Sequence, residues 1–171
     1  MEDPVYKKLF EMYSEHASKQ NEYFASLRNV ALGFRGSLQE KLGFPDGVYE
    51  THEGKKHWVR IYDLADSEID NNATAKLNVI DQHGNLRFAV GVALSSSLNS
   101  FPKHYFWLGY ELAKRGDNFI LREIGGEAKE FIIADETDMG HAVNSFIDVL
   151  KNWLTAGPED YFKPKRGIGF Y

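Results

Sequence analysis

PVYKKLFEMYSEHASKQNEYFASLRNVALGFRGSLQEKL, residues 4–42, carries apolar side chains at alternating steps of four and three residues. The series consists of Tyr6, Phe10, Tyr13, Ala17, Phe24, Leu27, Ala31, Phe34 and Leu38, with Gln20 in its one polar place. Such steps form a heptad seam along one side of an α-helix. The sequence therefore predicts a long helix over residues 4–42, with Asp3 as its cap and Gly43 as its stop.

The length of this helix leaves two arrangements open. At about 1.5 Å per residue, an unbroken helix would span roughly 60 Å, whereas six strands about 4.8 Å apart give a sheet only about 24 Å across. In the first arrangement the helix bends at Gly33 or Gly36 and lies on its own sheet, with the seam as core. In the second, the N-terminal half projects and pairs with another chain, and Gln20 helps to fix the register.

A projecting helix end would leave apolar side chains in water. These side chains are Val5, Tyr6, Leu9, Phe10, Met12 and Tyr13. At about 25 cal/mol per Å² of buried apolar surface, covering them with a second copy would contribute several kcal/mol before the costs of association. A twofold axis is the commonest arrangement for such a contact. The sequence therefore predicts a homodimer that forms through the N-terminal half of the first helix.

After Pro45 the apolar residues alternate with a period of two, which is typical of β-strands. The predicted strands are residues 55–64, 73–80, 85–94, 104–112, 118–124 and 129–134. Most connections between them are short and predict antiparallel hairpins, because parallel pairs need crossovers of a dozen or more residues. Residues 95–103, with Pro102 and several serines, predict a longer corner.

The C-terminal part of the sequence predicts a second helix and a tail. Residues 137–156 carry an apolar stripe that would dock on the sheet, with Thr137 or Asp138 as the cap. The tail, residues 158–171, contains several aromatic side chains, and we expect it to fold back as a strap. The alternative for the tail is a peptide that is offered to a partner.

Together these elements predict one α+β domain over residues 1–171. Its centre is an antiparallel β-meander of about six strands, residues 55–134, flanked by the long N-terminal helix and the C-terminal helix. One version of this fold is a helix-grip domain, in which the sheet curls around residues 139–154 and encloses a ligand pocket.

Two short motifs near the end of the sheet match functional patterns. Arg115-Gly116-Asp117 spells the tripeptide of cell-adhesion ligands, and Asp117, Glu127 and Lys129 have the D…ExK spacing of metal-dependent nucleases. Gly116 favours a turn, and Glu127 follows two glycines at the next turn. Seven strand residues of about 3.3 Å each separate the two turns by about 20 Å, too far for the two carboxylates to share an ion. We interpret both motifs as turns.

The sequence offers no other constellation for catalysis or for a cofactor. There is no cysteine, which excludes disulfides, thiolate metal sites and cysteine nucleophiles. The six histidines lack the spacing of a metal site, and the acidic residues within 63–70 lack the order of a calcium loop. No G-x-S-x-G elbow, GxGxxG motif or P-loop occurs. The sequence therefore predicts no catalytic residue, no cofactor and no metal.

The charge distribution disfavours some partners. The formal net charge is −5, and it lies in the middle of the chain, because residues 1–44 carry six basic and six acidic side chains. A nucleic-acid partner is disfavoured because no basic face is visible. A membrane is disfavoured because the longest apolar run, residues 88–94, is far shorter than the ~20 residues of a membrane span. The N-terminus lacks the features of a signal peptide, so we expect a cytoplasmic protein.

One feature of the strands suggests a binding surface. If Val59 and Phe106 face the helices, four large aromatic side chains lie on the opposite face of the sheet. They are Trp58, Tyr62, Tyr105 and Trp107. Such residues would contact a partner or a ligand. We favour the other interpretation, in which each helix covers one face of the sheet and these four side chains belong to the core.

The sequence favours a non-catalytic protein that binds other proteins, such as an inhibitor, an immunity-type protein, a chaperone or a complex subunit. The candidate partner contacts are Tyr6, Phe10, Tyr13, Trp58, Tyr62, Tyr105 and Trp107. The alternative is a small-ligand-binding or enzymatic domain of the helix-grip kind, with Trp58, Tyr62, His57 or Tyr105 lining the cavity.

Overall fold

A computed structural model describes residues 4–65, 68–69, 77–125, 128–156 and 168–170 of the chain. The elements are α1 (Val5–Leu42), β1 (Val48–Thr51), β2 (Gly54–His57), β3 (Val59–Ala65), β4 (Glu68–Ile69), β5 (Leu86–Leu94), β6 (His104–Arg115), β7 (Asn118–Ile124), β8 (Glu130–Ile133), α2 (Glu136–Thr155) and β9 (Ile168–Phe170). The structure confirms the α+β fold, with a long first helix, an antiparallel sheet and a C-terminal helix.

The main sheet has the strand order β4-β3-β5-β6-β7-β8, and β1 and β2 form a separate hairpin. All its paired strands are antiparallel. Along one edge of β6, β7 pairs with residues 109–115 while β9 pairs with residues 106–108. The predicted strap is thus present at the end of the tail, where β9 returns to the sheet; residues 157–167 lie outside the described part.

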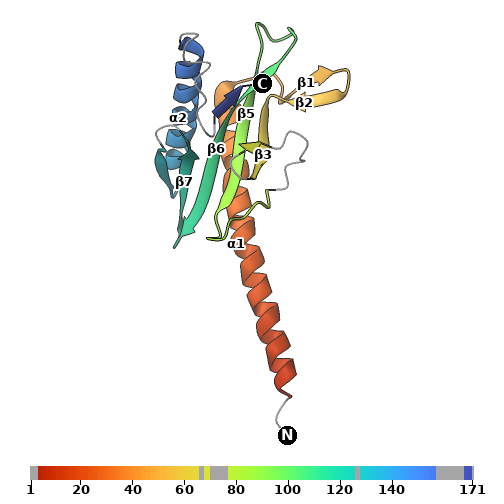
Figure 1. The fold of residues 1–171 in the computed structure, drawn as a ribbon, viewed down its shortest axis with the longest axis vertical. Helices are drawn as coiled ribbons and strands as arrows, with labels where there is room; N and C mark the ends of the chain where they lie inside the picture. The colour runs from red at the N-terminus through yellow and green to blue at the C-terminus, as the bar shows by residue number, and fades with distance from the viewer. Residues whose placement is uncertain (1–3, 66–67, 70–76, 126–127, 157–167, 171) are drawn as a thin grey trace.

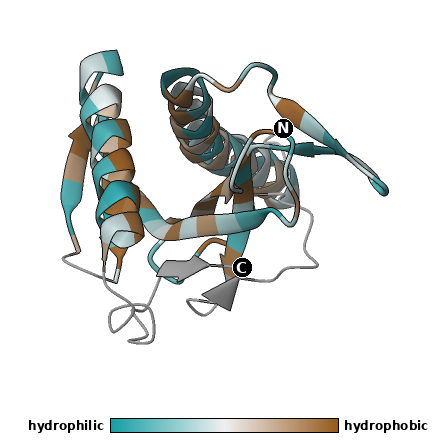
Figure 2. Cartoon of the chain, turned by 90° about the horizontal axis from the view of Figure 1, so that it is seen from above, coloured by the Kyte–Doolittle hydropathy of each residue, from teal (hydrophilic) through white to brown (hydrophobic). Residues whose placement is uncertain are grey.

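Both helices pack on the same face of the sheet, as Figure 2 shows from above. The register places Val59 opposite Val92 and Ile61 opposite Val90, and these side chains face the helices. The two helices also contact each other, since the rings of Phe34 in α1 and Phe146 in α2 lie 6.3 Å apart between centroids. The expectation of one helix on each face is therefore wrong.

The second face of the sheet is built from large and small side chains side by side. The central strand β5 presents Ala89, Gly91 and Ala93 there, and aromatic side chains of β3 and β6 lie over these small residues. Buried clusters join Trp58, Ala93 and Tyr105 on one side, and Tyr62, Ala89 and Trp107 on the other. Aromatic rings therefore fill this face, on which neither of the two described helices lies.

The first helix is a single uninterrupted helix, without a break at Gly33 or Gly36. It ends at Gly43, which has a left-handed φ of 67° and donates its backbone N–H to the Gln39 carbonyl oxygen. Pro4 occupies the N-cap position without a side-chain cap, and Asp3 lies outside the described residues. Figure 1 shows α1 running more along the strands than across them, with its N-terminal half projecting beyond the sheet.

The predicted strand at residues 73–80 is wrong in its described part. Leu77 has a positive φ of 53°, and only Ile80 forms an isolated bridge, with Leu86. The reason is a pair of polar contacts: the Leu77 N–H donates to Asp63 Oδ1 at 2.8 Å, and Arg28 Nε donates to the Leu77 carbonyl oxygen at 3.2 Å. These contacts bury the Leu77 side chain in the core without a strand. Residues 73–76 lie outside the described part.

Two other boundaries differ from the predicted ones. The predicted strand 55–64 is divided at Trp58, because residues 54–57 pair with β1 in the separate hairpin, which the periodicity did not reveal. The second helix begins at Glu136, and its N-cap is Asp135 rather than Thr137 or Asp138. Asp135 accepts from the Asp138 N–H at 2.9 Å, and Asp138 accepts from the Ala134 N–H at 2.9 Å. These reciprocal bonds resemble a capping box.

The packing on the second face predicts a stability effect at Gly91. A Cβ atom at this position would lie 2.7 Å from the Tyr62 ring, which is buried. We expect Gly91→Val to lower the free energy of unfolding by about 2 kcal/mol, because the ring has to shift. In the control Gly36→Ala, the added Cβ atom has no other atom within 4 Å. This change should raise the free energy of unfolding by up to about 1 kcal/mol. Urea denaturation measures both; unchanged stability in Gly91→Val would contradict the prediction.

Candidate functional site

The projecting end of α1 carries an apolar stripe, here called the tip stripe. It consists of Val5, Tyr6, Leu9, Phe10, Met12 and Tyr13, whose exposed fractions lie between 55% and 73%. Tyr6 and Phe10 contact each other edge to face, with their ring centroids 5.8 Å apart. Soluble proteins seldom leave a contiguous apolar patch of this kind in water unless it binds something. The tip stripe contains three of the predicted contacts, Tyr6, Phe10 and Tyr13.

The tip stripe continues the buried seam of the same helix. Leu27, Ala31, Phe34 and Leu38 are fully buried against the sheet. The body of the domain begins at Tyr23, whose hydroxyl donates to the Gly84 carbonyl oxygen at 3.1 Å. All side chains in residues 5–16 and 18–22 are exposed. One stripe of a single helix is therefore core in its C-terminal half and surface in its N-terminal half.

The four aromatic residues of the second face are placed as predicted but are nearly buried. Trp58, Tyr62, Tyr105 and Trp107 are between 4% and 9% exposed. The Arg60 guanidinium lies over the rings of Tyr62 and Tyr105, at 5.1 and 5.4 Å from their centroids. In this conformation these side chains do not form a broad exposed patch. Trp58 and Tyr105 instead line two open grooves beside the β1–β2 hairpin.

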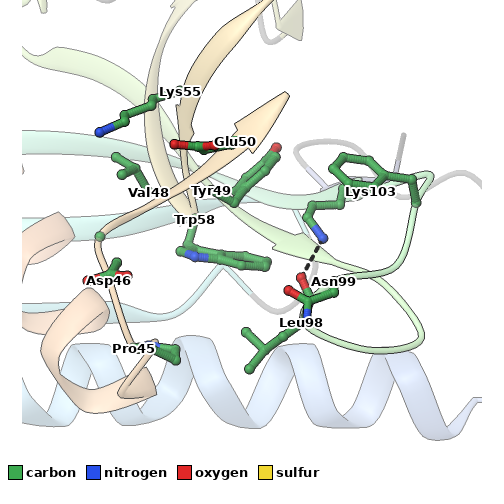
Figure 3. A pocket seen from close by; sticks show the side chains of 12 residues that line it. Pro45, Asp46, Val48, Tyr49, Glu50, Lys55, Trp58, Leu98, Asn99 and Lys103 are labelled. Atoms are coloured by element: carbon green, nitrogen blue, oxygen red, sulfur yellow. Dashed lines mark hydrogen bonds between the residues drawn. The ribbon is translucent and has the colours of Figure 1, made fainter. Parts of the chain in front are cut away.

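The larger groove lies between residues 45–50 and the loop of residues 98–103, and has a volume of about 750 Å³. Trp58 lies at its centre in Figure 3. The Phe44 ring stacks on Trp58 with centroids 4.5 Å apart, and the Tyr49 ring is tilted against it at 4.7 Å. The groove is lined by charges of both signs, from Asp46 and Glu50 and from the lysines Lys55 and Lys103.

Lys103 fills an aromatic cage in this groove. Its Nζ atom lies 4.8 Å from the Trp58 ring centroid, 5.1 Å from that of Tyr49 and 4.5 Å from that of Phe101. The ammonium group donates to the carbonyl oxygens of Leu98 at 2.9 Å and Ser100 at 2.8 Å, and the first of these bonds is drawn in Figure 3. A third bond reaches a serine hydroxyl at 3.3 Å. The cage therefore holds the loop onto the hairpin through the chain's own cation.

A second groove, of about 600 Å³, also lies beside the hairpin and is lined by Tyr49 and Tyr105. Tyr105 donates its hydroxyl proton to the His57 carbonyl oxygen at 2.8 Å, so Tyr49 donates to Tyr105 in the 2.6 Å bond between the two hydroxyls. Burial and the hydrogen bond to Tyr49 raise the pKa of Tyr105 well above its usual value. The Tyr105 phenol is therefore neutral at physiological pH, and two hydrogen bonds hold its hydroxyl.

A buried acidic residue that the sequence did not single out lies under α2. Glu123 pairs with Tyr110 across β6 and β7, and both are buried on the helix face. Burial and the nearby Glu123 carboxylate raise the pKa of Tyr110 well above its usual value. Ser145 of α2 donates to Glu123 Oε1 at 3.5 Å. Because this cluster lies inside the helix–sheet core, we assign it a structural role.

The remaining motifs give no catalytic geometry. Asp117 lies in the turn between β6 and β7, where Gly116 has a φ of 60°, as the sequence predicts, while Glu127 lies outside the described residues. Within the described ranges, no group of three or more His, Asp or Glu side chains could hold a metal ion. In the same part of the chain, no helix is both long and apolar enough to cross a membrane.

Sequence reasoning missed Lys103, which fills the cage, and it missed Tyr49 and Phe101, whose rings form the cage together with Trp58. Tyr49 belongs to a hairpin strand of only four residues, too short for its alternation to be recognised. Phe101 and Lys103 belong to the loop that the sequence predicts only as a corner. The available signal was Phe101, two residues before Lys103, which by itself does not specify a cage.

The cage predicts a specific loss of stability when Lys103 is changed. Lys103→Met keeps the length of the side chain but removes the charge and its hydrogen bonds, so we expect the free energy of unfolding to fall by about 1–3 kcal/mol. Lys55→Met is the control, since Lys55 is an exposed lysine that lines the same groove; it should change stability by less than about 0.5 kcal/mol. Equal effects in urea denaturation would contradict the role of the cage.

Comparison of the chain with protein-family models, with curated proteins and with solved structures found no match. The function must therefore be inferred from the tip stripe, the grooves and their chemistry.

Proposed function

We propose that this chain is a non-catalytic protein–protein interaction protein whose principal binding surface is the tip stripe, and that it forms a homodimer through that stripe. The observation that carries the proposal is the position of the stripe. It lies on a helix that projects from the domain, and six large apolar side chains on it are more than half exposed.

The energetics favour a covered tip stripe. Burial of a large apolar side chain contributes about 1.5–3 kcal/mol, so six of them offer several kcal/mol before the cost of association is subtracted. The projecting segment, residues 5–22, is also close to the length below which isolated helices are only marginally stable in water. A partner helix would therefore stabilise both the apolar surface and the helical conformation of this segment.

The charge of the projecting segment fits a second copy of the same chain. Residues 5–22 contain three lysines and three glutamates, Lys7, Lys8, Lys19, Glu11, Glu15 and Glu22, so that they carry no net charge. Two identical neutral segments can approach each other without net repulsion, whereas a strongly charged segment would require a complementary partner. A twofold axis would place the same stripe of each copy in the contact.

The packing of α2 weighs against the helix-grip alternative. The space between α2 and the sheet is filled by side chains, since the ring of Phe146 lies 5.9 Å from that of Phe106 and Trp153 lies 6.1 Å from Phe106. The two grooves around Trp58 and Tyr105 lie elsewhere, beside the hairpin, and both are open. Open surface grooves suit contact with a partner better than enclosure of a small molecule.

The proposed homodimer predicts that one charge in the tip stripe separates the copies. In light scattering at tens of micromolar, the wild-type chain should have twice the monomer mass of 19.5 kDa. The Phe10→Asp variant should have the monomer mass, because burial of an unpaired aspartate is too costly. Leu32→Asp is the matched control, since Leu32 is exposed on α1 outside the seam, and it should leave the dimer intact. A wild-type monomer would refute the homodimer, and circular dichroism would verify that the variants keep their fold.

A further inference from the structure

We infer that the two copies pair antiparallel, with each projecting helix end lying along that of its partner and the two domains at opposite ends of the helix pair. This inference rests on the proposed homodimer and adds the orientation and register of the contact. The inference rests on one feature of α1. The tip stripe and the contact with the sheet lie on the same side of this unbroken helix.

The side on which the domain lies excludes a parallel pair. A straight helix drifts by about 20° per heptad relative to a seam, so Tyr13 faces within about 40° of Leu27, two heptads further on. Leu27 is fully buried against the sheet. In a parallel pair the seams face each other, and both sheets would lie between helices whose axes are about 8–10 Å apart. A layer of sheet alone requires about 10 Å, so the two domains would overlap from Tyr23 onward.

An antiparallel pair avoids this overlap. The tips would overlap along residues 5–22, where α1 projects beyond the sheet over a length of about 27 Å. The seam then aligns Tyr6 with Ala17 of the second copy and Phe10 with Tyr13, in the alternating layers of an antiparallel coiled coil. In this register Val5 would lie opposite Ser18. The end of each helix thus stops about five residues before the point where the partner's domain begins.

The polar residues favour this register over its neighbour. A shift of one heptad toward the domain would bring Gln20 against Phe10 and would place Tyr6 against Phe24, which is already half-buried against the domain. The register with Phe10 opposite Tyr13 leaves Gln20 outside the contact. It also sets Lys7 near Ser14 at the flank, so no like charges face each other. Apolar layers and separate domains are therefore obtained together only in the antiparallel register.

The arrangement has a consequence for binding. The points at which the two domains begin, the two copies of Tyr23, would be separated by about 35 Å along the helix pair. The groove around Trp58 lies on each domain, so the dimer would present two copies of it at opposite ends. Such a dimer can hold two partner molecules apart or bind a repetitive partner at two points.

Cross-linking tests the orientation, and the absence of native cysteine makes single and paired variants unambiguous. In the double variant Tyr6→Cys/Ala17→Cys, a short bis-maleimide should join residue 6 of one copy to residue 17 of the other and give a covalent dimer on denaturing gels. The two positions are about 16 Å apart along one helix, so the short reagent cannot bridge them within a chain. Each single variant should give at least fivefold less covalent dimer than the double variant.

A second pair of cysteine substitutions leaves the apolar side chains of the seam unchanged. In Leu9→Cys/His16→Cys, both positions flank the seam, and Tyr6, Phe10 and Tyr13 remain native. The same pattern is expected, with cross-linking in the double variant and little in either single variant. This pair decides the orientation if the first weakens the dimer.

The outcomes separate the orientation from the proposed homodimer. Strong cross-linking of Tyr6→Cys alone would mean that residue 6 faces its own copy, as in a parallel pair, and would overturn the antiparallel arrangement while leaving the homodimer in place. A dimer mass by light scattering without cross-links in either double variant would also overturn it. A monomer mass for the wild-type chain would instead overturn the homodimer and, with it, the orientation.

Discussion

The burial of one side of α1 against the sheet is the interaction on which the rest of the structure depends. Leu27, Ala31, Phe34 and Leu38 are fully buried there, and each large side chain contributes about 1.5–3 kcal/mol. This contact fixes both the position and the direction of the helix. Because α1 continues without a break to Val5, the same contact also directs the N-terminal half away from the domain. The projecting end is thus a consequence of core packing and helix continuity together.

The two faces of the sheet are covered by different kinds of side chains. The helix face uses aliphatic and aromatic side chains that two helices cover, and these helices also pack against each other. On the other face, β5 contributes only Ala89, Gly91 and Ala93, so aromatic rings from the neighbouring strands can lie over it. The hairpin and the loop held by Lys103 extend this layer at one end. A thin aromatic layer thus stands where a second helix layer could lie, and open grooves lie beside the hairpin at its end.

These features together support the proposed role in protein–protein recognition. The tip stripe lies on a projecting helix, the grooves are open, and the aromatic cage is already occupied by Lys103. The hydroxyl of Tyr105 is engaged by two hydrogen bonds and stays neutral. In the proposed dimer, self-association uses the helix while the groove on each domain remains free for other partners. The two surfaces lie at different places on the molecule, so one chain can use both at once.

The sequence by itself determined the elements whose periodicity is long and regular. The heptad steps identified α1, the alternation identified β5, β6, β7 and β8, and the apolar stripe of residues 137–156 identified α2, because each pattern extends over several repeats. It also placed Trp58, Tyr62, Tyr105 and Trp107 on the face opposite the helices. The seam further showed that residues 6–17 belong to the same stripe as the core, although it left open whether the helix bends.

Only the tertiary structure decided the features that depend on contacts between distant residues. Leu77 leaves the predicted strand because Asp63 and Arg28 bind its backbone, and no local pattern contains that information. Both helices share one face because Phe34 and Phe146 meet above the sheet, while small residues of β5 leave room for rings on the other. The cage around Lys103 joins a short hairpin to a loop some fifty residues away. Periodicity records which side of an element is apolar; the three-dimensional packing decides what covers that side and where it remains exposed.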